Sequence, residues 1–353
     1  MSCGYVLDYF GCNVTFIERH SAVAQETSFQ NGGLLCPSQS DSWTYWKNIT
    51  WSKLSNIRLG PHLVRHYRWF SSWLGSTYCS TDLQIRQLSE LSMVSMHAPP
   101  FDSILKSYGC HATGTYDVLS HKTYSDDKNG DVKSFSDAIF KRLSTRCIFR
   151  FQTTVTGFQR EGNKITGLQV RDVSPDSENS ESIIHADAFV LATGNGTQSL
   201  LSRLGLYVPI LPVLGYLRTF TVTHQQKYPQ KKNLKFQNYF VSPLSSLKYR
   251  ASAFADIGFT QTQLSREQDL CDLVSRDFPA HKLVSTYHGF RPLSPDDLPY
   301  IGRAKPFQNL FVCAGHGSKG WTQAAGSAVL LKQIIFGEHP VIRTEPFEPN
   351  RFE

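Results

Sequence analysis

Residues 309–331, NLFVCAGHGSKGWTQAAGSAVLL, have an order of residue types that can bind an anionic group through the backbone. The apolar run 310–313 predicts a strand, and the Ala- and Leu-rich run from Trp321 onward predicts a helix. The turn between them contains Gly315, His316, Gly317, Ser318, Lys319 and Gly320. A strand, a glycine turn and a helix in this order present unpaired backbone N–H groups and a positive helix end to a ligand. For this stretch taken alone, an ordinary glycine-rich βα connection is the alternative.

A second candidate binding residue is Glu18, an acid at the end of a predicted strand. Residues 3–11 fit a helix ended by Gly11, and residues 13–17 fit a strand. In a βαβ unit that binds a dinucleotide, an acid at the end of the second strand binds a ribose hydroxyl. The glycine-rich fingerprint of such a unit should precede the helix by a few residues, but the sequence starts there with Met1. We therefore expect the phosphate loop to be missing.

Length and composition exclude several classes of protein. The 353 residues are 40% hydrophobic and 18% charged, which indicates a soluble globular chain with two or three domain-sized units. No run of 18 apolar residues predicts a transmembrane helix, and the first residues lack the basic region of a signal peptide. The cysteines form no C-x-x-C pair, so neither zinc nor a redox dithiol is indicated, and free thiols suit a reducing compartment. We expect a cytoplasmic protein that binds no nucleic acid.

Residues 43–74 combine basic and aromatic side chains without any acid. The residues concerned are Trp43, Trp46, Trp51, Trp69, Trp73, Lys47, Lys53, Arg58, Arg65 and Arg68. A basic, tryptophan-rich segment is typical of a peripheral contact with a membrane surface. The alternative is a pair of helices covering a substrate domain, with tryptophan in the core and arginine at the solvated rim. The sequence leaves both interpretations open.

The remaining segments predict a mixture of helices and strands. We expect mostly helices in 40–109, an exposed turn at 125–131, a hairpin in 155–173, a buried strand in 184–193, strands in 213–259, and a proline-rich loop in 288–302 that closes on a short strand. The small residues between Ala324 and Ala328 would let the last helix lie close against a ligand or a sheet.

Three separated segments occur in an order that resembles a known family. They are the strand ending in Glu18 with ETSFQNGG after it, the segment HADAFVLATGNG, and GFRPLSPDDLPYIG leading into NLFVCAGHGSKGWT. This combination resembles the FAD-dependent D-amino-acid oxidase superfamily and, within it, the D-amino-acid dehydrogenases of the small-subunit type. The likeness covers nearly the whole chain. The paired G-F-R-P…P-Y-I-G and G-H-G-S-K-G-W-T segments are its most specific part.

The resemblance implies an α/β fold with two domains. An FAD/NAD(P)-binding Rossmann-like domain would be assembled from residues 1–38, 133–215 and 297–340. An α+β substrate domain with an antiparallel sheet would come from 39–132 and 216–296, followed by a tail at 341–353. The family carries a further helix and strand between the counterparts of Leu119 and Ser125, which this chain lacks. With the missing phosphate loop, this gap indicates either a gene-model error or a truncated paralogue.

The resemblance also implies which residues bind FAD. Glu18 would accept hydrogen bonds from the adenosine ribose, and Val155 would contact the adenine side through its backbone. The loop that passes the pyrophosphate and the flavin ring would contain Ser28, Asn31, Gly32 and Gly33. The residues that close over the dinucleotide would be Ala192, Thr193 and Gly194. Those that hold the pyrimidine edge of the flavin would be Gly315, Gly317, Gly320, Trp321 and Thr322.

Three residues are candidates for catalysis. By resemblance, Arg291 of G-F-R-P would clamp the substrate carboxylate, for which a guanidinium fork is well suited. A surface ion pair of Arg291 with Asp296 or Asp297 is the alternative. Tyr216 could line the substrate pocket or belong to the core. For His316 we favour a role in positioning the flavin over that of a general base.

The activity implied by the resemblance is oxidative deamination of a D-amino acid. A hydride would pass from the substrate Cα to flavin N5, and hydrolysis of the imine would give a 2-oxo acid and ammonia. Electrons would go to an acceptor other than oxygen, and residues 43–74 offer a contact with a membrane quinone. The alternatives are a related oxidase of glycine, sarcosine or imino acids, or an inactive paralogue without the phosphate-binding loop.

Overall fold

The computed structural model describes residues 1–29, 31–108, 112–175, 180–223, 228–229 and 231–353, without the side chains of 51–52 and 106–108. Cys110 and the side chain of Trp51 therefore lie outside the described part. The α-helices are α1 (Ser2–Tyr9), α2 (Trp51–Ser55), α3 (Tyr67–Ser76), α4 (Asp82–Met96), α5 (Asp102–Tyr108), α6 (Val132–Leu143), α7 (Thr197–Ser202), α8 (Leu264–Asp277) and α9 (Gly320–Phe336).

The strands are β1 (Thr15–Ile17), β2 (Leu34–Leu35), β3 (Ile57–Leu59), β4 (Thr115–Asp117), β5 (Thr123–Tyr124), β6 (Lys128–Asn129), β7 (Ile148–Arg150), β8 (Thr153–Glu161), β9 (Lys164–Asp172), β10 (Glu181–Ile184), β11 (Phe189–Leu191), β12 (Leu211–Val222), β13 (Asn233–Lys235), β14 (Tyr239–Pro243), β15 (Lys248–Ile257), β16 (His281–Leu293), β17 (Tyr300–Arg303) and β18 (Leu310–Ala314). Short 3₁₀ turns include η4 (Gly194–Gly196) and η5 (Gly317–Lys319).

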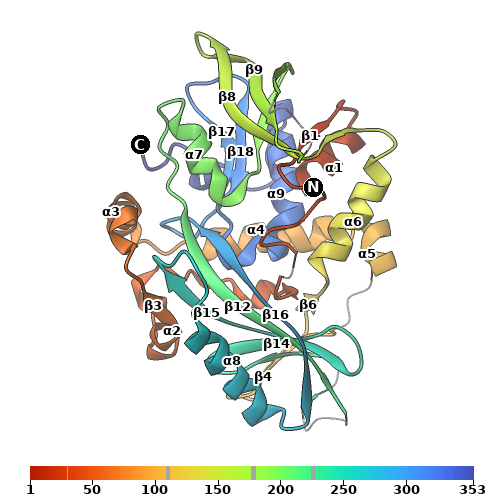
Figure 1. Ribbon diagram of the computed structural model, residues 1–353, viewed down its shortest axis with the longest axis vertical. Coiled ribbons are helices and arrows are strands. Elements are labelled where there is room, and N and C mark those ends of the chain that lie inside the picture. The colour runs from red at the N-terminus through yellow and green to blue at the C-terminus, as the bar shows by residue number, and fades with distance from the viewer. Residues whose placement is uncertain (30, 109–111, 176–179, 224–227, 230) are drawn as a thin grey trace.

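The upper half of the molecule in Figure 1 contains short parallel strands and the helices that pack on them. Strand β1 pairs with β7, and β11 pairs with β18, both in parallel. All five residues of β18 are buried, which explains its continuous apolar sequence, because a strand covered on both faces needs no polar alternation. The β8–β9 hairpin follows the predicted positions and projects at the top of the view.

The lower half is built on a larger sheet in the order β16-β12-β15-β14-β13-β4-β5. The long strands β12 and β16 are antiparallel, with Gly215 opposite Gly289. Helix α8 covers this sheet through Leu270 and Val274, which belong to the same apolar cluster as Phe220. The expected strands in 213–259 and the mixed α/β fold class are confirmed.

Helix α9 contacts the β17–β18 sheet, as expected, through Leu330 and Leu331, and at Gly326 it also packs closely against another helix. A Cβ atom added to Gly326 would lie 2.7 Å from the backbone nitrogen of Ser92 and 2.8 Å from the carbonyl oxygen of Leu88, both in α4. The absence of a side chain at Gly326 therefore lets α4 approach α9 at backbone contact. This packing buries the central helix of the upper half.

Three predictions of local structure were wrong in part. Residues 40–109 are mostly helical, as expected, through α2 to α5, but they also contain β3, which pairs with β15. The expected exposed turn at 125–131 includes β6 and the buried Asp127, whose carboxylate accepts hydrogen bonds from Ser38. The expected loop at 288–302 begins as strand, because β16 continues to Leu293 along β12.

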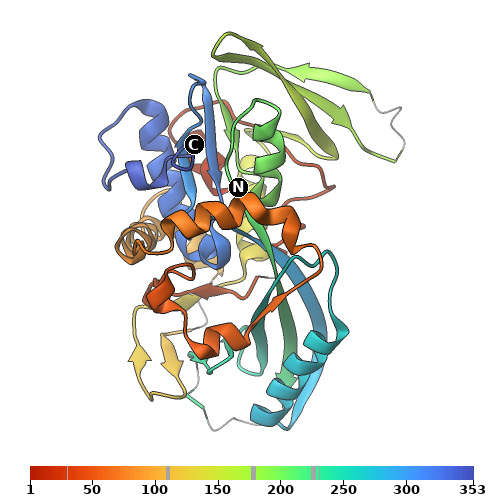
Figure 2. The same ribbon diagram turned by 90° about the vertical axis from the view of Figure 1, so that its left-hand side faces the viewer.

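The tryptophans of residues 43–74 fall into two groups. Trp69 donates its ring N–H to the carbonyl oxygen of Leu293, and Trp73 donates to that of Thr44, so both have structural roles. Trp43 and Trp46 are exposed. In Figure 2 the segment lies across the face nearest the viewer. The described helices include none that is long and apolar enough to cross a membrane.

Candidate active site

The predicted strand, glycine turn and helix at 309–331 form β18, η5 and α9. Gly315 and Gly317 have φ values of +82° and +56°, in the left-handed region that favours glycine. A Cβ on Gly315 would lie 2.8 Å from the ring of Tyr300, and one on Gly317 would lie 3.0 Å from Leu293 Cδ1. Gly320 begins α9, and a Cβ atom added to it would lie 3.4 Å from His316 Cβ. The turn therefore requires glycine at its first two sites for both conformation and space.

His316 is half-buried in this turn and its ring is held from α9. Its Nε2 atom lies 3.0 Å from Ser327 Oγ, and its backbone forms a bridge with Leu293 at the end of β16. Burial lowers the pKa of His316 to about 4, so the imidazole is neutral at physiological pH. A neutral ring fixed by a hydroxyl suits a residue that positions the turn.

Arg291 lies on the face of β16 that is directed towards the upper half of the molecule. Residues 289, 291 and 293 share that face, because side chains alternate along a strand. The Cβ position of Gly289 is 3.5 Å from Thr27 Cα, and Leu293 contacts Gly317 in the turn. Arg291 therefore lies between the loop around Thr27 and the glycine turn. Its guanidinium rests on Gly215, where a Cβ would be 2.2 Å from Nη2.

The charge of Arg291 is not neutralised by the acids that follow it. Its Nη1 donates to the carbonyl oxygen of Phe254 at 2.7 Å. Asp296 binds Arg351 and Asp297 binds Lys319, so the surface pair that we left open as an alternative is not formed. Burial lowers the pKa of Arg291 to about 10, partly offset by the charge of Asp256, and the side chain is cationic at neutral pH.

Two polar residues join the upper half to β16 beside Arg291. Thr27 Oγ1 and Asn195 Nδ2 both donate to the carbonyl oxygen of Phe290, at 2.8 and 2.9 Å. Sequence reasoning did not assign a role to either residue. Their positions in the sequence could have indicated a role in the site. Thr27 directly precedes the predicted loop at Ser28, and Asn195 follows Gly194 in the A-T-G-N-G segment.

The predicted loop after β1 has the conformation that its glycines suggested. Asn31 Oδ1 accepts the N–H of Gly33 at 2.9 Å, and Gly33 has φ +78°. A Cβ on Gly33 would be 3.0 Å from the carbonyl oxygen of Gly130, whereas Gly32 lies against Ser252. Ser28 is exposed. The loop thus runs between β2 and the larger sheet.

Of the residues predicted for the adenosine end, Glu18 and residues 192–194 lie where strands of the upper half end, whereas Val155 lies within β8. Glu18 is half-buried after β1, and its Oε1 accepts the N–H of His20 at 2.9 Å. After β11, Ala192 and Thr193 are exposed, and Gly194 has φ +51°. Val155 is half-buried on β8 and packs, like Ile17 of β1, against the cluster that contains Leu191. Ends of strands at one edge are where open α/β sheets bind ligands.

Three predicted site residues have their side chains in the interior. Tyr216 is fully buried, donates to Asp256 Oδ2 at 3.0 Å and accepts the N–H of Gln263, which is the core position that we had left open. Trp321 packs edge-on against Phe135 at 4.8 Å. Thr322 Oγ1 donates to the carbonyl oxygen of Leu34 and accepts the N–H of Cys36, so it anchors β2 to α9.

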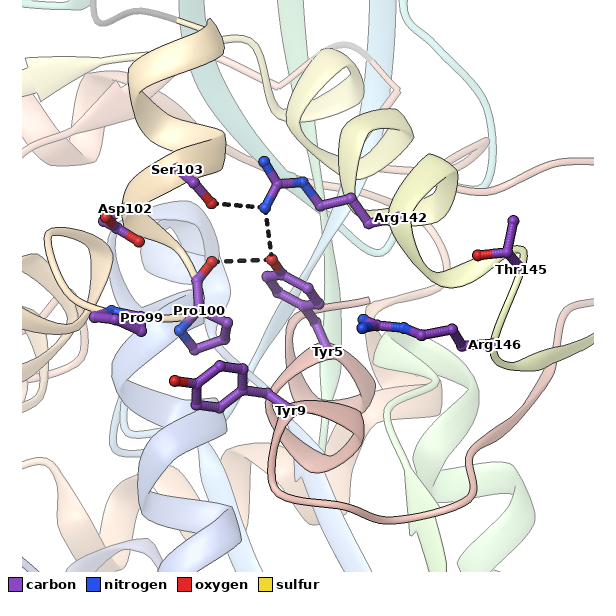
Figure 3. A pocket seen from close by; sticks show the side chains of 9 residues that line it. All are labelled: Tyr5, Tyr9, Pro99, Pro100, Asp102, Ser103, Arg142, Thr145 and Arg146. Carbon is purple, nitrogen blue, oxygen red and sulfur yellow. Dashed lines mark hydrogen bonds between the residues drawn. The ribbon is translucent and has the colours of Figure 1, made fainter.

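A pocket of about 520 Å³ lies on the outer side of the upper half, between α1 and the end of α6 (Figure 3). Tyr5 and Arg142 line it, and Arg142 donates to the hydroxyls of Tyr5 and Ser103. Arg146 at its rim is paired with Asp8 at 2.6 Å. No residue predicted for the site lines this pocket, so it is separate from the glycine turn.

Comparison with known proteins connects this geometry to a family. A family described as DAO, FAD dependent oxidoreductase, matches residues 1–334. The chain belongs to this family. It is an FAD-dependent oxidoreductase, as the sequence resemblance predicted.

Several proteins to which the chain is similar are enzymes of amino acids. The chain is similar to D-amino acid dehydrogenase of Methylobacterium sp. (strain 4-46), with 26% identity over 424 residues that cover 100% of the chain and 96% of that enzyme. Among solved structures it is similar to glycine oxidase from Bacillus cereus ATCC 14579, with a TM-score of 0.66, 17% identity and coverage of 97% and 95%. It is also similar to L-proline dehydrogenase from P. horikoshii, with a TM-score of 0.72, 14% identity and coverage of 99% and 94%. These structures establish the fold.

The residues around the glycine turn fit a cofactor of the DAO family. Two buried polar side-chain atoms without a hydrogen-bond partner among the described residues, Ser294 Oγ and Asp297 Oδ1, belong to residues that contact the turn at Gly315 and Gly317. Unpaired buried polar atoms are costly unless a ligand or water satisfies them. Because the flavin's pyrimidine edge carries donors and acceptors, these two unsatisfied atoms beside the turn are consistent with FAD there.

Proposed function

We propose that the chain catalyses FAD-dependent oxidative deamination of D-amino acids, giving a 2-oxo acid and ammonia, with electrons passed to an acceptor other than oxygen. The observation that carries the proposal is the position of Arg291. On β16 it lies between Gly289, which faces Thr27, and Leu293, which contacts the glycine turn, and its cationic guanidinium lies over Gly215 and donates to the carbonyl oxygen of Phe254. A guanidinium with donors to spare can bind a carboxylate in two places at once.

The chain's own residues would orient the substrate and not transfer its proton. Bound FAD supplies the hydride acceptor. Arg291 would hold the carboxylate, and Gly215 leaves the space that its guanidinium occupies. His316, whose pKa is lowered to about 4 by burial, is neutral and would keep the turn in place. An amino acid that reaches the site with a neutral amine then needs orientation more than a base.

The D-amino-acid preference is supported by the likeness to D-amino acid dehydrogenase over almost its whole length. An oxidase of glycine, sarcosine or an imino acid is the second candidate, since Arg291 would serve any of these carboxylates. A panel of D-amino acids, their L-enantiomers, glycine, sarcosine and proline distinguishes the two.

We also propose the division into an FAD-binding domain (1–38, 133–215 and 297–340) and a substrate domain (39–132 and 216–296).

The variants Arg291→Lys and Arg291→Met test the carboxylate assignment. Loss of the bidentate charged contact should lower kcat/KM on the order of 100-fold in Arg291→Met, and lysine should restore only part of it. Retained FAD absorbance and an unchanged urea midpoint would exclude general misfolding. Full turnover by Arg291→Lys would show that Arg291 does not bind the carboxylate as proposed.

We propose that the electron acceptor is a quinone reached from a membrane surface, through residues 43–74. Exposed apolar side chains of this segment include Val64 at 79% and Tyr67 at 69%, next to the exposed Arg65 and Arg68. A surface with both apolar and basic exposed side chains favours binding to an anionic bilayer. Val64→Ser with Tyr67→Ser should reduce co-flotation with anionic liposomes, whereas Leu264→Ser, at an 81% exposed site elsewhere, should not. Equal flotation of all three proteins would refute the contact.

A further inference from the structure

A buried ion pair lies directly beside the glycine turn. Lys319 Nζ is 2.5 Å from Asp297 Oδ2, and the two side chains are only 7% and 1% exposed. Lys319 ends η5 and immediately precedes α9, whereas Asp297 belongs to the connection between β16 and β17. Charges this deeply buried are stable only when they are paired. The pair therefore fixes the turn to the segment that follows Arg291.

Asp297 is held by more than Lys319. Its Oδ2 also accepts the backbone N–H of Trp43 at 2.8 Å, so one carboxylate joins three segments distant in sequence. Its backbone has φ +62°, which costs energy for a residue other than glycine. Its Oδ1 has no hydrogen-bond partner among the described residues and lies 3.1 Å from the Cβ position of Gly317. The carboxylate thus reaches the back of the turn itself.

No neighbouring acid takes the place of Asp297 as the partner of Lys319. Asp296 is directed elsewhere and makes two hydrogen bonds to Arg351. Lys53 is a further cation nearby: burial and the charge of Lys319 lower its pKa, whereas the charges of Asp41, Asp297 and Asp82 act to raise it. Removing Asp297 would consequently leave an excess of positive charge at the amino end of α9, and removing Lys319 would leave an excess of negative charge.

We propose that Asp297 and Lys319 are positioning residues that act as one neutral unit. They hold the glycine turn in place and cancel each other's charge, so that the electrostatic field of the turn comes mainly from the end of α9. This rests on the proposed function, because it places the flavin's pyrimidine edge at residues 315–322. Reduction adds negative charge to the flavin, so an unbalanced charge beside the turn must change its reduction potential with a definite sign.

The test measures the midpoint potential of FAD-loaded wild type, Asp297→Asn, Lys319→Met and the double variant. Asp297→Asn should shift the potential to more positive values, Lys319→Met to more negative values, and the double variant should return close to wild type. A purely structural pair would not give shifts of opposite sign. In urea unfolding, each single variant should lose more stability than the double variant, since each leaves one buried charge unpaired.

Lys332→Met is the matched control, because it removes another lysine–carboxylate pair, near the far end of α9. Lys332 Nζ is 2.5 Å from Glu338 Oε1. It lies roughly 20 Å along the helix from Lys319, so it should leave the potential unchanged. If Lys319→Met does not fold, Lys319→Arg replaces it and should retain the wild-type midpoint potential. Asp297→Asn then still tests whether loss of the negative charge shifts the midpoint potential to more positive values.

Shifts of the same sign in both single variants, or none, would overturn this proposal in a protein that binds FAD. A wild-type protein that takes up no FAD would overturn the proposed function and this proposal together.

Discussion

At the scale of single residues, Gly215 decides where the proposed substrate clamp can lie. The guanidinium of Arg291 occupies the space that a side chain at position 215 would fill, with Nη2 and Cζ 2.2 and 2.3 Å from the Cβ position. An arginine side chain is flexible, so a methyl group here would displace the clamp before it displaced the backbone. Gly289, directly opposite on β16, has only ordinary contacts at 3.5 Å or more.

The paired variants Gly215→Ala and Gly289→Ala use this difference. Gly215→Ala should lower kcat/KM on the order of 10- to 100-fold, because misplacing a clamp by an ångström or more costs rate. Gly289→Ala should remain within a few-fold of wild type. Steady-state kinetics with the best D-amino acid measures both, and urea unfolding shows whether either fold is weakened. Equal activity of the two variants would contradict the proposed place of Arg291.

At the scale of elements, the contact between α4 and α9 depends on Gly326. A Cβ atom there would come within 2.7 and 2.8 Å of backbone atoms of α4, which cannot rotate out of the way. Gly326→Ala should therefore destabilise the protein by about 1–3 kcal/mol through overpacking. Gly75→Ala in the exposed helix α3, with no atom within 4 Å of its Cβ position, should be neutral or stabilising by about 0.5–1 kcal/mol.

Urea unfolding of these two variants measures the difference. A Gly326→Ala protein as stable as wild type would mean that α4 is not seated on α9 as described.

The elements that the sequence predicted well are those that local chemistry determines. Glycines with positive φ, at positions 33, 315 and 317, were recognisable because no other residue suits their turns, and the strand β18 was recognisable from its continuous apolar run. The errors came from distant contacts. Asp127 and Asn129 have the polarity of an exposed turn, but their partners are Ser38, Ala112 and Pro243. No local sequence pattern indicates such distant hydrogen-bond partners.

The site residues divide in the same way. The role of Arg291 stays a prediction from the resemblance of G-F-R-P to a family motif, and the strand that carries Arg291 was expected to be a loop. Tyr216 could not be placed, because its hydroxyl is used by Asp256 and Gln263, forty or more residues away. The ion pair of Lys319 with Asp297 could not be foreseen either. In the sequence, Asp296 and Asp297 are indistinguishable, and only the fold directs one to Arg351 and the other to Lys319.

At the scale of the whole molecule, two long strands bring the proposed substrate clamp to the cofactor turn. β12 and β16 belong to the large sheet of the lower half, yet the end of β16 reaches the upper half, where Leu293 bridges to His316 (Figure 1). Arg291 and the glycine turn therefore belong to different parts of the chain but meet at one place. This arrangement is what the proposed function requires, a carboxylate binder in front of a flavin.

The most direct test of the account is anaerobic reduction of the FAD-loaded protein by amino acids, followed by the loss of flavin absorbance. The account predicts that D-amino acids bleach the flavin, that their L-enantiomers do not, and that Arg291→Met is bleached far more slowly at equal substrate concentration. A protein that binds FAD but is bleached by glycine, sarcosine or L-proline and not by any D-amino acid would contradict the proposed function.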